Sequence, residues 1–139
     1  MKVFVNAVEL IGTKPAPSAS PLIEFKQRSV HVSSVEHLAK RLGADASTLL
    51  DLMGIPERTR ARRRHEGFFK ADEADRLLRI ARVFAEAIRV FGSEGKAALW
   101  LKTPSPLFEN TAPLTWLDSD GGAHAVSEEI VRIDFGDFA

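Results

Sequence analysis

Apolar residues recur at helical spacing over residues 71–91, and this pattern constrains the fold more than any other feature of the chain. Side chains three or four positions apart fall on one face of an α-helix, and an apolar face has to be buried. Acidic residues occupy the first turn, where they suit the helix dipole, and Gly92 follows the end. The pattern predicts a long amphipathic helix whose apolar stripe consists of Ala74, Leu77, Leu78, Ala81, Phe84, Ile88 and Phe91.

Shorter helical segments are predicted on both sides of this helix. Ser34, Asp45 and Ser93 each stand where a side chain can cap a helix that follows. Pro113 opens a brief helix, and a final helix is expected over about 121–133. Trp100 and Trp116 occur among leucines and are interpreted first as core residues. The chain is therefore predicted to be all-α, with a helix-turn-helix N-terminal part followed by a small helical domain.

The first 30 residues are expected to form a flexible arm and linker. Residues 1–12 are apolar enough for an edge strand or for an arm that a partner orders. Residues 13–21 contain three prolines, which remove backbone donors and restrict the chain, so they are predicted to be a linker.

Composition excludes several classes of function. The chain has no cysteine, and its four histidines show no metal-ligand spacing, so neither a metal nor another cofactor is expected. No phosphate-binding loop or nucleophile motif is evident, and an enzyme is not expected. No apolar run approaches the roughly 20 residues of a membrane span, and the predicted location is the cytoplasm.

The zero net charge conceals an asymmetry between the two parts of the chain. From residue 103 onward a single arginine stands against seven carboxylates, which gives this part a charge of −6 and the preceding residues +6. Such a split favours a basic part that binds nucleic acid and an acidic part with a different partner.

The positive charge is concentrated in residues 54–67, which contain five arginines. Pro56 suits the first position of a helix and Gly67 suits the position just past its end. The length and charge of this helix fit the second helix of a helix-turn-helix that contacts DNA phosphates.

Two helix-turn-helix frames compete in this part of the chain. The first would place residues 45–53 in the DNA groove, but these residues are apolar and acidic. The second uses 46–53 as the supporting helix and 56–66 as the recognition helix, and the arginines favour it.

Within the recognition helix, Arg58 and Arg62 lie four residues apart on one face and can pair with guanine. Glu57, Thr59 and Arg63 complete the predicted groove-facing set, while Arg60 and Arg64 are predicted to contact phosphates.

Arg60 occupies a position where such helices usually bury an aliphatic side chain, so either the helix docks loosely or the Arg60 stem packs while its charged head reaches solvent. A helix-turn-helix domain usually binds DNA as a dimer that contacts two half-sites, so a homodimer is expected. The predicted DNA-binding residues are thus Arg58, Thr59, Arg60, Arg62, Arg63 and Arg64.

Five segments together resemble one known family. The first is Gly54-Ile55-Pro56-x-x-Thr59-x-Ala61-Arg62-Arg63, and the second is Glu73-x-Asp75-Arg76-Leu77-Leu78-Arg79. Trp100-Leu101-x-x-Pro104, Pro113-Leu114 and Arg132-Ile133-x-Phe135-Gly136 follow in this order. Over about residues 45–139 this succession is similar to the Xre/MbcA/ParS antitoxins. The chain departs from the usual family pattern at Arg60, at residues 108–112, where a Gly-rich loop is common, and at Phe135, where tyrosine is common.

The resemblance implies an antitoxin of a type II toxin-antitoxin system. It implies an Xre-like DNA-binding domain, here over residues 31–69, and a helical toxin-binding domain over 70–139. Family members usually neutralise a RES-domain toxin, which consumes NAD, by blocking its active site. They also bind operator DNA and repress their own operon.

The acidic C-terminal part gains a role from this resemblance. A toxin that binds NAD needs cationic groups for the pyrophosphate, and an acidic segment with aromatic residues complements such a pocket. The predicted toxin-binding residues are Arg132, Asp134, Phe135, Gly136, Asp137, Phe138 and Ala139. The competing interpretation is that both phenylalanines pack back onto the helices.

Two other functions stay open at this point. The chain could be a stand-alone helix-turn-helix regulator whose C-terminal half only dimerises it. It could also be a chromosome-partition accessory, which would bind DNA at many sites.

Overall fold

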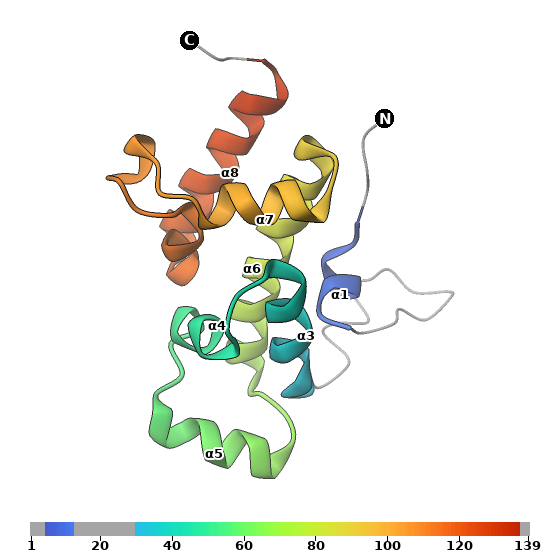
Figure 1. Ribbon diagram of the computed structural model, residues 1–139. Coiled ribbons are helices and arrows are strands. Elements are labelled where there is room, and N and C mark those ends of the chain that lie inside the picture. The colour runs from blue at the N-terminus through green and yellow to red at the C-terminus, as the bar shows by residue number, and fades with distance from the viewer. Residues whose placement is uncertain (1–4, 13–29, 137–139) are drawn as a thin grey trace.

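The computed structural model describes residues 5–12 and 30–136, and the regular structure in these residues is helical (Figure 1). Two isolated β-bridges, between His31 and Phe68 and between Ser105 and Thr111, are the only β-type pairing in the described ranges. The prediction of an all-α chain is therefore confirmed. The α-helices are α1 (Ala7–Leu10), α3 (Ser33–Leu42), α4 (Ala46–Leu52), α5 (Glu57–Glu66), α6 (Ala71–Phe91), α7 (Glu94–Lys102) and α8 (Asp120–Asp134), and two 3₁₀ helices, η1 (Pro106–Phe108) and η2 (Pro113–Asp118), lie between α7 and α8.

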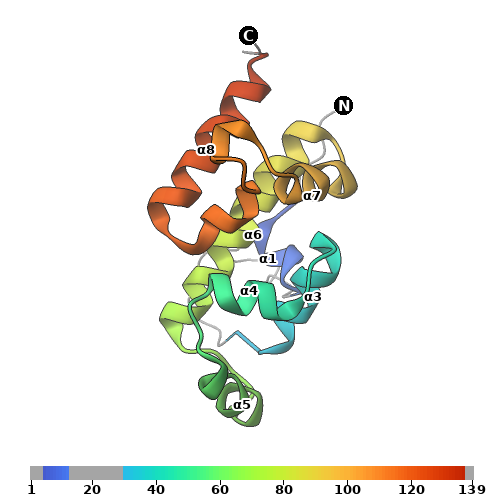
Figure 2. The same ribbon diagram turned by 60° about the vertical axis from the view of Figure 1, so that its left-hand side comes forward.

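Helix α6 is the central element, and its bounds match the long helix that the apolar periodicity predicted over residues 71–91. It extends over 21 residues and ends at Gly92, which adopts the left-handed conformation. Helices α1, α7 and α8 all pack against it. In Figures 1 and 2 the helix runs along the long axis of the molecule, with α3 and α4 beside its first half and α7 and α8 beside its second half. Phe84 in its middle is completely buried.

Residues 5–12 differ from the expected edge strand or partner-ordered arm. Residues 7–10 form α1, and the side chain of Asn6 caps it by accepting a hydrogen bond from the Val8 amide at 2.8 Å. Val8, Leu10 and Ile11 are buried in the common core. A short helix is stable here because its apolar side chains pack on α6, which lies more than 60 positions away in the sequence. The linker predicted over 13–21 lies outside the described residues.

The predicted starts of three helices can be compared with the structure. Asp45 and Ser93 occupy N-cap positions, and the Ser93 hydroxyl accepts a hydrogen bond from the Lys96 amide. Ser34, by contrast, lies inside α3 and is buried, because the helix begins at Ser33 with Val32 as its N-cap, two positions before the predicted cap.

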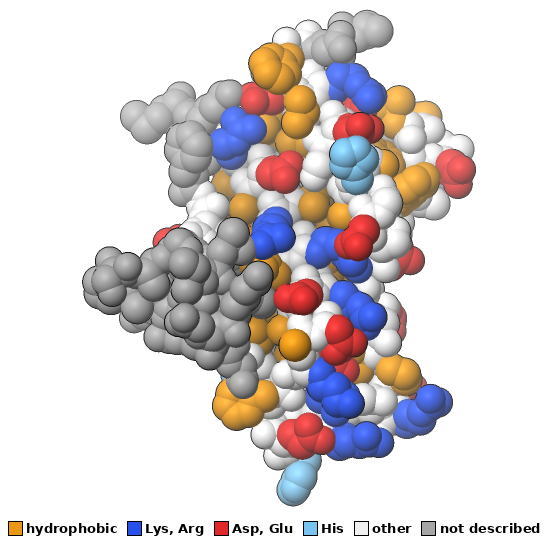
Figure 3. All heavy atoms as spheres, turned by 180° about the vertical axis from the view of Figure 1, so that it is seen from behind, with side chains coloured by type: hydrophobic (Ala, Val, Ile, Leu, Met, Phe, Trp, Pro, Cys, Tyr) orange, Lys and Arg blue, Asp and Glu red, His pale blue; other side chains and the backbone are white. Residues whose placement is uncertain are grey.

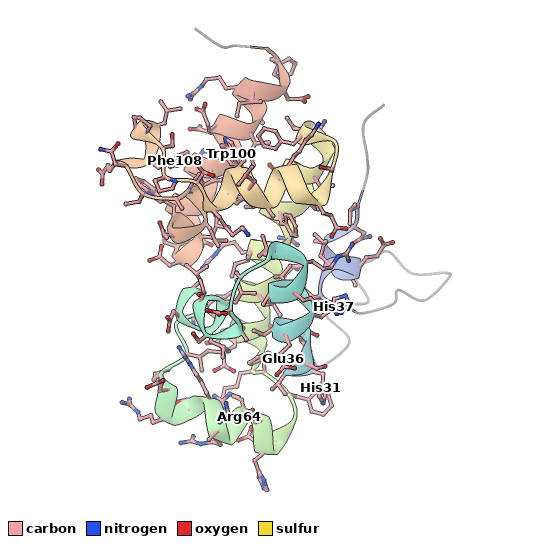
Figure 4. The ribbon with its side chains drawn as sticks, in the orientation of Figure 1. His31, Glu36, His37, Arg64, Trp100 and Phe108 are labelled. Atoms are coloured by element: carbon pink, nitrogen blue, oxygen red, sulfur yellow. The ribbon has the colours of Figure 1, made fainter. Side chains whose placement is uncertain are left out.

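The C-terminal half contains a row of four aromatic rings. Phe91, Trp100, Phe108 and Trp116 follow one another with centroid separations of 5.4, 6.3 and 5.4 Å. Trp100 and Phe108 are labelled in Figure 4. Phe108 is buried, whereas both tryptophans are partly buried against the core. The row joins α6, α7, η1 and η2, so the expectation that the tryptophans are core residues is met in part.

The helix-turn-helix half and the C-terminal half share one hydrophobic core. Polar contacts also link them: Arg41 on α3 pairs with Glu94 on α7 at 2.6 Å, and Lys102 donates to the carbonyl of Gly43 at 3.1 Å. Because α6 belongs to both halves, the position of α5 relative to α8 is set by a single packed body.

Candidate nucleic-acid interface and the C-terminal surface

Helix α5 carries the five arginines and lies at one end of the molecule (Figure 1). Pro56 occupies its N-cap, one position earlier than predicted, and Gly67 ends it with a φ of 90°. Seen from behind, Lys and Arg side chains are prominent toward this end (Figure 3). The helix preceding it, α4, buries Leu49 and Leu52. This arrangement is consistent with α4 as the supporting helix and α5 as the exposed one.

Three of the predicted DNA-binding arginines are exposed to solvent. Arg58, Arg62 and Arg64 are all exposed, and Thr59 is half-buried. Arg58 and Arg62 lie four residues apart and therefore share one face of α5. These residues are available for a polyanionic ligand.

Arg60 has a different environment from the one predicted. Its side chain is 10% exposed, and it pairs through Nη2 with Asp51 of α4. Its Nε also donates to the carbonyl of Ile55 at 2.9 Å. The charged head is thus directed at neighbouring protein groups, so the assignment of Arg60 as a phosphate contact is corrected.

Arg63 is the one buried residue of α5 and cannot face a groove in this structure. Its Nε lies 2.7 Å from Oε1 of Glu73 and its Nη2 lies 3.1 Å from Oε2, a bidentate pair. Glu73 Oε1 also accepts a hydrogen bond from the Lys70 amide at 2.8 Å. The groove-facing assignment of Arg63 is therefore wrong, because the partner that binds it lies on another helix, ten positions along the chain.

The ion pair changes the protonation equilibria of both partners. Burial raises the pKa of Glu73, but the hydrogen bonds from Arg63 and from the Lys70 amide, together with the positive charge of Arg63, lower it by more, and the net shift is downward. The hydrogen bond with Glu73 raises the pKa of Arg63 and outweighs the effect of burial. Both groups are therefore held in their charged forms.

A groove of about 310 Å³ separates α5 from α3 and α4. Arg64 of α5 and Glu36 of α3 both line it (Figure 4). Its apolar lining consists of Val32, Val35, Ala46, Leu50 and Phe69. Helix α5 therefore does not pack closely on the apolar surface beside it.

The residues predicted to bind a toxin lie at the C-terminal end of α8. Phe135 is 82% exposed, and Gly136 is also exposed. Arg132 pairs with Glu129 at 2.6 Å. Asp134 differs from the prediction, because its side chain is only 15% exposed and lies 3.2 Å from Arg89 of α6. Asp137, Phe138 and Ala139 lie outside the described residues.

Exposed apolar side chains gather in the C-terminal half. Of the five exposed large hydrophobic residues in the described ranges, four belong to this half. Sequence reasoning missed Leu99 and Leu107, because nothing local distinguishes an exposed leucine on a helix from a buried one. The four residues are Leu99, Leu107, Val131 and Phe135.

Other kinds of site have little support among the residues that the structure describes. Residues 5–12 and 30–136 hold no group of three His, Cys, Asp or Glu side chains placed to bind a metal ion. His124 is exposed and lies 3.0 Å from Glu128. Within the same ranges no helix has the length and hydropathy needed to cross a membrane.

Two protein-family models match the chain, one after the other. Residues 21–82 match the antitoxin Xre-like helix-turn-helix domain. Residues 86–136 match the antitoxin Xre/MbcA/ParS C-terminal toxin-binding domain. Both are families of binding domains and not of enzymes.

Curated relatives agree with these matches. The chain is 30% identical to antitoxin Xre of Yersinia enterocolitica over 127 residues, which cover 90% of this chain and 86% of the relative. It is 32% identical to antitoxin Xre of Photorhabdus laumondii over 124 residues, which cover 88% and 84%. The chain therefore belongs to the Xre/MbcA/ParS family of antitoxins, with an Xre-like helix-turn-helix domain followed by a toxin-binding domain.

Proposed function

We propose that the chain is the antitoxin of a RES–Xre system, which neutralises an NAD-consuming toxin and represses its own operon. The observation that carries the proposal is the placement of the two surfaces. Helix α5 lies at one end of the long axis and the C-terminal end of α8 at the other (Figures 1 and 2). A protein partner on α8 would therefore leave α5 free to bind DNA.

Helix α5 supports the DNA-binding part of the proposal. Arg58 and Arg62 project from one exposed face, and arginine can pair bidentately with guanine or with phosphate. Arg64 adds a third exposed cation. A homodimer would present two such helices to half-sites about one helical turn of DNA apart. The ligand we assign to this surface is the operator of the chain's own operon.

The C-terminal half supports the toxin-binding part. The charge of −6 over residues 103–139 complements the cationic pocket that binding of the NAD pyrophosphate requires. The exposed Val131 and Phe135 offer apolar contacts at the end of α8. The family resemblance points to a RES-domain protein as the toxin, and the tail would cover the NAD site of that toxin. In this proposal the antitoxin acts by binding alone and catalyses nothing.

The division of functions between residues 31–69 and 70–139 is tested with variants that each remove one of the two proposed activities. The toxin gene beside the antitoxin gene is expressed with each antitoxin variant, and growth, cellular NAD and operator occupancy are measured together. Arg58→Ala with Arg62→Ala is expected to abolish operator binding and to leave growth and NAD protected. Removal of residues 135–139 is expected to abolish protection and to leave operator binding intact.

A matched control removes two positive charges elsewhere. Arg82→Ala with Lys96→Ala changes exposed cations on α6 and α7 and is expected to alter neither readout. Full protection by the shortened chain would overturn the toxin-blocking role. Unchanged operator affinity in the Arg58/Arg62 double variant would overturn the DNA-binding role of α5.

A further inference from the structure

We propose that Glu73 and Asp51, two acidic residues outside α5, are positioning residues for DNA binding. They bind Arg63 and Arg60 and thereby orient Arg58 and Arg62 toward DNA. This inference rests on the proposed function of α5. It divides the arginines into two sets with different roles: some contact the ligand and others hold the helix.

Helix α5 has almost no apolar side chains with which to pack against the rest of the protein. Its sequence is ERTRARRRHE, and the single apolar residue, Ala61, is exposed. A helix that is polar on all sides gains no stability from an apolar face. The groove of about 310 Å³ beneath it shows that the apolar residues of α3 and α4 do not fill the gap. Polar contacts must therefore set the position of this helix.

The first polar contact holds the C-terminal half of α5. Arg63 forms a bidentate pair with Glu73 in the first turn of α6, and both side chains are less than 10% exposed. A bidentate arginine–carboxylate pair fixes orientation as well as distance. Because α6 is the central helix of the core, Glu73 is itself held firmly. Backbone hydrogen bonds from Val32 to Gly67 and from Phe69 to Val30, both 3.0 Å, secure the segment that follows α5.

The second polar contact holds the N-terminal half of α5. Arg60 pairs with Asp51 on α4 and donates to the carbonyl of Ile55 in the turn between the two helices. Arg60 and Arg63 are three positions apart, so they lie on the same side of the helix. At 100° per residue, Arg58 and Arg62 lie on roughly the opposite side. Binding of Arg60 and Arg63 to the body therefore directs Arg58 and Arg62 away from it.

The charge of Glu73 makes the inference testable. A purely electrostatic role and a positioning role for Glu73 predict opposite changes in DNA affinity when this charge is removed. If only electrostatic attraction mattered, removing a negative charge near α5 would strengthen binding to DNA. If Glu73 positions the helix, removing its charge weakens specific binding, because the base-contacting side chains are misplaced. Contacts with phosphates tolerate such displacement better than contacts with base edges do.

The experiment uses the full chain and the DNA fragment immediately upstream of its own gene, with a shuffled duplex of equal length for comparison. Glu73→Gln is expected to weaken binding to the upstream fragment at least tenfold and to change binding to the shuffled duplex less than threefold. Asp51→Asn is expected to act in the same direction. Asp72→Asn is the matched control, since Asp72 is the adjacent residue and is exposed. It is expected to leave the affinity unchanged or slightly higher.

The outcomes separate this inference from the proposed function. If the Arg58/Arg62 double variant loses specific binding but Glu73→Gln binds as tightly as the wild type, the positioning role is overturned and the function stands. If the double variant also binds normally, the function of α5 fails and the inference fails with it.

A second variant addresses the possibility that Glu73→Gln disturbs folding. Helical content and binding to the co-expressed toxin report the integrity of the rest of the chain. If either is reduced, Arg63→Lys decides, because it keeps the charge and loses the bidentate geometry. Loss of the preference for the upstream fragment in Arg63→Lys supports the positioning role, and an unchanged preference overturns it.

Discussion

The guanidinium of Arg89 lies 3.2 Å from Oδ2 of Asp134, which ties the last turn of α8 to the last turn of α6. The residue that follows, Phe135, is 82% exposed. These neighbours therefore have different roles, although both were predicted to contact a toxin. Asp134 holds the end of the helix in place, and Phe135 is presented to solvent at the position where a partner can reach it.

Phe135→Ala is expected to weaken toxin binding at least tenfold, which corresponds to about 1.4 kcal/mol. An exposed aromatic side chain that becomes buried in an interface often contributes this much or more. The free energy of unfolding should change by less than about 0.5 kcal/mol, because the ring packs on little in the free protein. Binding is measured by calorimetry with an inactive toxin, and unfolding with urea. Leu107→Ala, which removes another exposed apolar side chain, is the comparison, and an equal loss in both variants would contradict a specific role for Phe135.

Gly122→Ala is expected to destabilise the protein by about 1–3 kcal/mol, as overpacked sites commonly do. A Cβ at this position would lie 1.9 Å from the carbonyl oxygen of Trp116. Gly121 is the matched control, because a Cβ there meets nothing within 4 Å and alanine favours a helix by up to about 1 kcal/mol over glycine. Urea unfolding followed by tryptophan fluorescence compares the two variants. Equal stability would show that the start of α8 can move away from η2 without cost.

Phe84→Ala is expected to lower the free energy of unfolding by about 3–5 kcal/mol, because the ring is completely buried in the middle of α6. Since both halves share one core, they should unfold together in one transition. For each protein, the variant as well as the wild type, calorimetry and far-ultraviolet circular dichroism are expected to give one and the same midpoint, and the midpoint of the variant is expected to be lower. Two separate transitions would mean that the halves fold independently.

The pH dependence of stability should reflect the lowered pKa of Glu73. A carboxylate with a lower pKa in the folded state stabilises the protein above its ordinary value of 4.5, and this stabilisation is lost as the pH falls through the lowered value. The difference in unfolding free energy between the wild type and Glu73→Gln should therefore be constant above about pH 5.5 and shrink below pH 4.5. Subtracting the variant removes the contribution of the other carboxylates. A difference that does not change between pH 7 and pH 3 would contradict the assignment.

Local patterns in the sequence were sufficient to predict most of the helices. The stripe from Ala74 to Phe91 defines α6 because burial of an amphipathic face depends on periodicity within one segment. Gly67 and Gly92 end their helices as predicted, because a left-handed residue after a helix is a local requirement. The family was also recognisable, since five segments in a fixed order are a property of the sequence itself.

The order of residues along the chain is therefore enough to identify a helical antitoxin with an arginine-rich helix and an acidic, aromatic C-terminal segment. The division of the arginines becomes visible only once the helices are packed together. Arg58, Arg62 and Arg64 are exposed, whereas Arg60 and Arg63 bind Asp51 and Glu73. Spacing along a helix shows which side chains share a face, but not which face meets the rest of the protein. That choice depends on carboxylates carried by other helices, whose positions are set by packing around α6.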